Sequence, residues 1–179
     1  REDRLWFRSP FTKFLSRALN KLGLKRWVNG IFLADQQRLA LASLRRLKQV
    51  YPDVKAVIVG LGDASLKEAG IHDLRTRRMD RDTELAWCAA YAESQVVIGV
   101  HGSNMLLPTA LAAGCIEILP YDRYGNIVQD VAVRYRDVMQ LFLYRFVDEF
   151  ASSRVVARHA ISLFKDFPVF HRNNRINVP

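Results

Sequence analysis

The chain has 179 residues, 50% of them hydrophobic and 11% aromatic, which suits one domain with a packed core and excludes a wholly disordered segment. Its net charge of +9 favours anionic partners such as nucleotide phosphates, nucleic acids or an acidic membrane face. No run approaches the roughly 18 to 20 apolar residues that cross a bilayer. The start, REDRLWFRSP, has no initiator Met and no signal-peptide pattern, so we expect a fragment or processed piece.

Residues 1–30 are predicted to form a basic amphipathic helix and linker, distinct from a domain over residues 31–179. Ser9-Pro10 is typical of a helix start, and Gly23 of its end. Apolar residues recur between them at helical spacing: Phe11, Phe14, Leu15, Ala18, Leu19 and Leu22. Basic residues occupy much of the opposite side: Arg8, Lys13, Arg17, Lys21, Lys25 and Arg26. Two readings stay open: the helix packs on the domain, or it docks on a membrane surface or a partner.

The next segments alternate between helix and strand. A helix is predicted over residues 34–50, and a strand buried on both faces over the apolar run VKAVIVG at 54–60. The inner side of that helix is assigned to Leu39, Ala42, Leu47 and Val50. A glycine-rich turn follows at 61–63, then a polar segment, then a short strand or loop at 74–80.

The second half continues the alternation. A helix is predicted over 82–93, with Leu85, Cys88, Ala89 and Ala92 as its inner positions. Strands are predicted at 95–100 and 115–119, separated by a helix at 104–113 that Gly114 caps. Residues 127–150 are interpreted as a short loop followed by a helix, 154–164 as a closing helix, and 173–179 as a frayed tail.

This alternation predicts the α/β class, with a Rossmann-like parallel sheet covered by helices on both faces. The only two cysteines, Cys88 and Cys115, lie in apolar stretches and form no C-x-x-C pair. We therefore expect reduced thiols in the core, with no disulfide framework and no metal site.

Four small or polar residues, His101-Gly102-Ser103-Asn104, follow the strand at 95–100. Ligands of open parallel sheets bind beyond the carboxyl ends of strands, where helix N-termini attract phosphate. Gly102 would allow a close approach of the backbone, Ser103 or Asn104 would cap the next helix, and His101 would bond a phosphate or sugar oxygen. The alternative is an ordinary strand-to-helix turn. A serine nucleophile is disfavoured, because GVHGSN lacks the G-x-S-x-G elbow.

The segment SQVVIGVHGSNMLLPTALAAGCIEILP resembles family-61-like GT-B glycosyltransferases. The match rests on a strand ending in His101-Gly102-Ser103, a following helix, and an apolar strand with Glu117 before a proline. Upstream, LASLRRLKQVYPDVKAVIVGLGD is similar to a wider GT-B pattern, so the resemblance covers about residues 35 to 125.

The resemblance implies one half of a GT-B fold, the half that binds a UDP- or GDP-linked sugar for transfer to a glycan or lipid-linked acceptor. No permanently bound cofactor and no metal are implied, and no catalytic residue is assigned. The residues expected at the donor or its phosphates are His101, Gly102, Ser103, Asn104, Gly60, Gly62, Asp63, Arg77, Arg78 and Glu117. The side chain of Glu117 is expected to reach either the site or a structural partner. Asp63 has the alternative of a turn-forming residue. The alternative for Arg75, Arg77 and Arg78 is that they are solvated surface residues.

A whole GT-B enzyme would need roughly twice this length, so the acceptor-binding half is expected to lie outside the chain. A rival hypothesis is a non-catalytic Rossmann-like module that docks on a membrane or a partner protein through its basic helix. Nucleic-acid binding is disfavoured, because the aromatic residues do not alternate with the basic ones as a stacking platform requires. The expected location is cytoplasmic, with peripheral contact at the inner membrane face.

Overall fold

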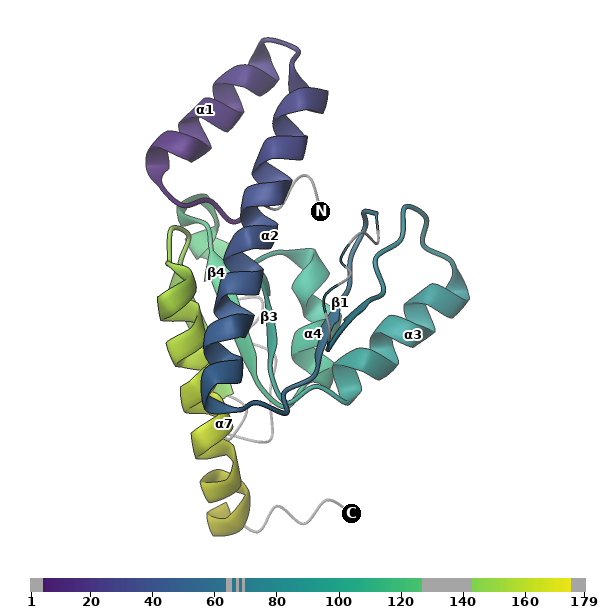
Figure 1. Ribbon diagram of the computed structural model, residues 1–179, viewed down its shortest axis with the longest axis vertical. Helices are drawn as coiled ribbons and strands as arrows, with labels where there is room; N and C mark the ends of the chain where they lie inside the picture. The colour runs from purple at the N-terminus through teal and green to yellow at the C-terminus, as the bar shows by residue number, and fades with distance from the viewer. Residues whose placement is uncertain (1–4, 64–65, 67, 69, 127–142, 175–179) are drawn as a thin grey trace.

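The computed structural model describes residues 5–63, 66, 68, 70–126 and 143–174. It is an α/β fold in which parallel strands form two small sheets flanked by helices (Figure 1). The first sheet pairs β1 (Ala56–Ile58) with β2 (Ile71–Asp73). The second has the order β3 (Val97–Val100), β4 (Cys115–Leu119) and β5 (Tyr144–Asp148). All the strand pairs are parallel, as the alternating pattern predicted.

The first two helices form a hairpin at one end of the molecule (Figure 1). Helix α1 (Pro10–Lys21) begins at the predicted Ser9, which forms a capping box with Thr12. Helix α2 (Lys25–Val50) starts nine residues before the predicted 34 and so runs through position 30. Its buried side includes Leu39 and Leu47 as predicted, whereas Val50 is exposed.

The core lies between the second sheet and the helices that cover it. Strand β4 is central and buried along its whole length, with Ile116 and Ile118 inside the apolar cluster. Helix α7 (Ser153–Asn174) packs along α2 and against β4, where it buries Val156 and Leu163 (Figure 1). It extends ten residues beyond the predicted end at 164.

Two predictions need correction, the one for the strand at 54–60 and the one for the helix within 127–150. Strand β1 is shorter than 54–60 and not buried on both faces, because Val57 is exposed. Residues 74–80, predicted as a short strand or a loop, form a loop in which Thr76 bridges to Leu61, and β2 lies just upstream. Within the segment predicted as loop and helix, 127–142 lie outside the described residues, and 144–148 form β5 instead of a helix. Residues 175–179 of the predicted tail are also outside the described part.

Helix α3 (Arg81–Ala92), which precedes the second sheet, buries a different face from the one predicted. Its buried residues are Trp87 and Tyr91, whereas Leu85 is exposed and Cys88 is half-buried. Ala89 and Ala92 are exposed as well. The two aromatic rings lie four residues apart on one face, and they take the buried side because they remove the most apolar surface from water.

Candidate functional site

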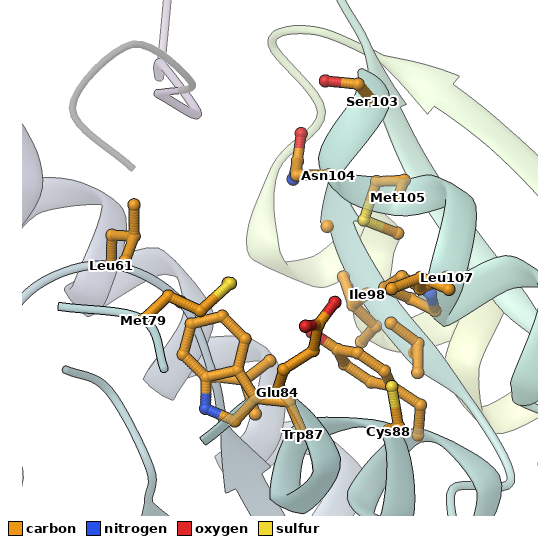
Figure 2. Close-up of a pocket in the computed structure, with 16 residues that line it drawn as sticks. Leu61, Met79, Glu84, Trp87, Cys88, Ile98, Ser103, Asn104, Met105 and Leu107 are labelled. Atoms are coloured by element: carbon orange, nitrogen blue, oxygen red, sulfur yellow. The ribbon is translucent and has the colours of Figure 1, made fainter. Parts of the chain in front are cut away.

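A cavity of about 300 Å³ lies where the loops that follow β1 and β3 approach helix α3 (Figure 2). Gly60 and Leu61 line it from the loop after β1, Trp87 and Tyr91 from α3, and Asn104 from the turn after β3. Both loops follow the carboxyl ends of parallel strands, which is where α/β sheets bind their ligands. This cavity is therefore the candidate site.

Three of the residues predicted at the site line this cavity: Gly60, Ser103 and Asn104. Figure 2 shows Ser103 and Asn104 on one side of the opening, with Leu61 and Met79 across from them. The other predicted residues are not part of the lining: Gly62, Asp63, Arg77, Arg78, His101, Gly102 and Glu117.

The loop after β1 has a backbone that favours glycine. Gly60 and Gly62 have φ angles of 136° and 156°, which residues with a side chain rarely adopt. The Gly62 N–H donates to the carbonyl of Thr76 at 2.9 Å, and the Thr76 N–H donates to that of Gly60 at 3.2 Å. These bonds hold the loop beside residues 75–78. A Cβ at Gly60 would meet nothing within 4 Å, so the backbone there is open to a ligand.

The arginines beside this loop have different surroundings. Arg75 forms two side-chain hydrogen bonds with the buried carboxylate of Asp73, and this pairing lowers the pKa of Asp73 to about 2. Arg77 pairs with Asp63 on the exposed surface and lowers the pKa of that carboxyl. Arg78 is exposed and directly precedes Met79, which lines the cavity.

The turn after β3 differs from the predicted capped helix. Gly102, with φ of 154°, precedes a 3-10 turn at Ser103–Met105, and α4 (Leu106–Leu111) follows it. Neither Ser103 nor Asn104 caps a helix through its side chain. Gly114 is not the helix cap either, since α4 ends at Leu111 and its C-cap is Ala112. Gly114 instead permits close packing, because a Cβ there would lie 3.2 Å from the carbonyl oxygen of Gln95.

His101 lies beneath this turn instead of at the surface. Its ring is 1% exposed, and its Nδ1 atom bonds the carboxylate of Glu117, which is completely buried. The Tyr144 hydroxyl donates to the same carboxylate, and Phe146 packs edge-on against the imidazole. Burial and the bond to Glu117 raise the pKa of Tyr144. The Glu117 carboxylate thus bonds His101 and Tyr144, and Glu117 does not line the cavity.

The aromatic wall of the cavity was not predicted as part of a site. Trp87 and Tyr91 line it from α3, and the Trp87 indole N–H donates to the carbonyl of Leu74 at 2.9 Å. Burial raises the pKa of Tyr91. The spacing of the two residues by four in the sequence was the signal that could have identified them.

One buried polar atom in the lining lacks a partner. The Oδ1 atom of Asn104 is inaccessible to solvent and accepts no hydrogen bond from the described residues. Most buried polar atoms in proteins are satisfied, so an unpaired acceptor beside a cavity favours a ligand that donates to it.

Metal ligands and membrane spans were searched within the described ranges. These contain no cluster of three or more His, Cys, Asp or Glu side chains arranged to hold a metal ion. Among the same residues, no helix has both the length and the apolar composition that crossing a bilayer requires. Neither Cys88 nor Cys115 forms a disulfide bond.

The chain was compared with protein-family models, curated proteins and solved structures, and none of them matches it. Its function must therefore be inferred from its own residues and their arrangement.

Proposed function

We propose that the chain is the donor-binding domain of a GT-B-type glycosyltransferase with a Rossmann-like sheet, and that its cavity receives a nucleotide sugar. The observation that carries this proposal is the joint placement of Gly60, Ser103 and Asn104 along one cavity. They come from two loops at the carboxyl ends of parallel strands, the position at which doubly wound folds bind nucleotides.

The nucleoside end of the donor fits the aromatic part of the cavity. A volume of about 300 Å³ is at the lower end of the range for ligand pockets, which suits a base and ribose better than a whole nucleotide sugar. Trp87 and Tyr91 offer apolar surface to a base. The Oδ1 atom of Asn104 is unpaired but closed to solvent, so the amide turns toward the cavity when it accepts a hydrogen bond from a base N–H or a ribose hydroxyl.

The diphosphate is assigned to the rim of the cavity. The backbone at Gly60 is open to close approach, and the exposed Arg78 lies next to the lining residue Met79. A guanidinium there would neutralise the charge that develops on the diphosphate as it leaves the sugar. Arg77 is a weaker candidate, because its guanidinium already pairs with Asp63.

His101 has a different role from the phosphate contact that the sequence resemblance implied. In the proposed mechanism it is a positioning residue: its bond to Glu117 fixes the end of β3 from below and so fixes the turn that carries Ser103 and Asn104. We assign donor binding to this chain and leave acceptor binding and the catalytic base unassigned. The acceptor class remains a glycan or a lipid-linked glycan.

The proposal is tested by titrating the full chain with UDP and with GDP in a calorimeter. We expect one of them to bind, and we expect Asn104→Ala to weaken it about fivefold, since a lost hydrogen bond costs about 1 kcal/mol. Arg78→Ala should weaken the diphosphate but not the free nucleoside. Asn20→Ala, at an exposed position on α1, is the matched control and should bind like the wild type.

Two results would overturn the proposal. One is a folded wild-type chain that binds neither nucleoside diphosphate. The other is binding that is unchanged in both Asn104→Ala and Arg78→Ala, because the ligand would then lie outside the cavity.

A further inference from the structure

Helix α1 packs on the rest of the molecule through its polar side. Ser16 is buried there, and the largely buried Lys13 forms an ion pair with Glu149. Arg17 adds a contact to Asp122 at 3.5 Å. An amphipathic surface helix ordinarily buries its apolar stripe against the core, so α1 has the reverse orientation.

The apolar side of α1 consequently faces outward. Phe11, Phe14 and Leu22 are 70%, 68% and 73% exposed, and Leu15 is exposed as well. Their spacing of three, four and seven residues places them on one face of the helix. Figure 1 shows α1 at one end of the molecule, beyond the ends of β4 and β5. Two large aromatic side chains and two leucines on one short helix form an apolar patch that marks an interaction surface.

The charges that α1 itself carries are all positive, and the exposed Asp122 beside it contacts Arg17 at 3.5 Å. Lys13, Arg17 and Lys21 are the only ionisable residues in α1, which contains no acidic residue. Arg17 and Lys21 are one turn apart and exposed, so their stems can lie along the apolar side while their charges reach outward. Tyr121 is 78% exposed and shares a surface hollow with Phe14. Its phenol adds an amphipathic ring of the kind found at bilayer interfaces.

We propose that the outward face of α1 docks on an anionic lipid bilayer, with the helix lying in the plane of the interface. The apolar side chains enter the boundary between headgroups and acyl chains, and Arg17 and Lys21 pair with acidic headgroups. A bilayer is favoured over a protein groove because the exposed side is one helix face with a basic flank, the pattern of interfacial helices. This inference is independent of nucleotide-sugar binding.

The test is co-sedimentation of the full chain with vesicles of phosphatidylcholine alone or mixed with phosphatidylglycerol, at low and high salt. We expect binding to the mixed vesicles that weakens with salt. Phe14→Ala/Leu22→Ala should reduce binding at least about tenfold. Its matched control, Leu85→Ala/Leu106→Ala, removes two apolar side chains that are more than half exposed from α3 and α4 and should leave binding unchanged.

A second pair of variants isolates the charges. Arg17→Gln/Lys21→Gln should weaken binding and flatten its salt dependence, whereas Arg46→Gln/Lys55→Gln, at exposed positions elsewhere, should change it much less. Circular dichroism verifies that each variant is folded.

Several outcomes would contradict the proposal: no binding to mixed vesicles, equal binding to neutral vesicles, or wild-type binding by Phe14→Ala/Leu22→Ala. Self-association in solution that this variant abolishes would assign the face to a second copy of the chain instead. Titration of the same variants with nucleoside diphosphates distinguishes this failure from a failure of the donor-binding proposal.

Discussion

A buried carboxylate needs hydrogen-bond donors, and Glu117 finds them in residues that are far apart in the sequence. His101 lies just after β3, and Tyr144 begins β5, on either side of the central strand that carries Glu117. The sequence allowed both a ligand and a structural partner for Glu117. It could not decide between them, because the decision depends on the register of β4 against both neighbours, and β5 was not predicted.

The carboxyl of Asp73 is expected to make the stability of the fold depend on pH. Its side chain is buried, and it accepts hydrogen bonds from Arg75 and from the Leu66 N–H. Its pKa falls to about 2 in the folded chain from an ordinary 3.8. Folding therefore stabilises the ionised carboxylate. Its contribution to the free energy of unfolding is complete above about pH 4 and is lost as the pH falls through about 2.

We expect Asp73→Asn to lower the free energy of unfolding at neutral pH by an amount on the order of 1 kcal/mol, since solvent screens part of the pairing. In urea titrations, the difference from the wild type should shrink as the pH falls from about 4 to about 2. Asp53→Asn, at an exposed position, serves as the control. A difference that is constant across this pH range would contradict the assignment.

At the scale of the elements, the sequence predicted where most helices and strands lie but not all their faces and ends. The apolar residues of α3 were assigned inward at Leu85 and Cys88, yet Trp87 and Tyr91 are the buried ones. Small and medium side chains permitted several inward faces, and the packing of α3 against α4 and the bond from Trp87 to Leu74 selected one. Strand β5 was missed because LFLYRFVDEF has no clear alternation of apolar and polar residues.

Helix α3 provides the aromatic wall of the cavity, so the stability of its first turn can be tested by mutation. The Asp80 side chain accepts the backbone N–H of Thr83 at 2.8 Å, and Asp82 and Glu84 add negative charge near the N-terminus. Asp80→Ala should lower the free energy of unfolding by about 1 kcal/mol and speed amide hydrogen exchange in the first turn of α3.

Asp80→Asn is the matched control, because asparagine also caps helices and should keep most of this stability. Equal losses in both variants would indicate that charge, and not the capping bond, stabilises the turn.

For the whole molecule, the segment before α1 joins parts of the chain that are distant in sequence. Trp6 is buried in the apolar cluster; its backbone N–H donates to the Gln36 side chain, and its indole N–H donates to the carbonyl of Ala151 at 2.8 Å. The N-terminal segment thus shares a core with α2 and the C-terminal helix. This contact could not be predicted, because one tryptophan in a basic stretch has no periodic pattern to place it.

Trp6→Ala should therefore lower the free energy of unfolding by about 3 to 5 kcal/mol, the usual cost of removing a buried aromatic side chain. Circular dichroism in urea should show one transition at a lower midpoint, because the segment and the sheet unfold together. Phe11→Ala removes an exposed ring from the neighbouring helix and should leave the midpoint nearly unchanged. Two separate transitions in the wild type would contradict a shared core.

The difference in exposure between the two cysteines makes Cys88 a natural reporter on the cavity. Cys88 lines the cavity and is half-buried, whereas Cys115 is 2% exposed within the central strand. In the folded chain, a thiol-specific reagent should therefore modify Cys88 first and reach Cys115 only after unfolding. A molecule that fills the cavity should slow the first reaction, and mass spectrometry would detect its binding without any engineered probe.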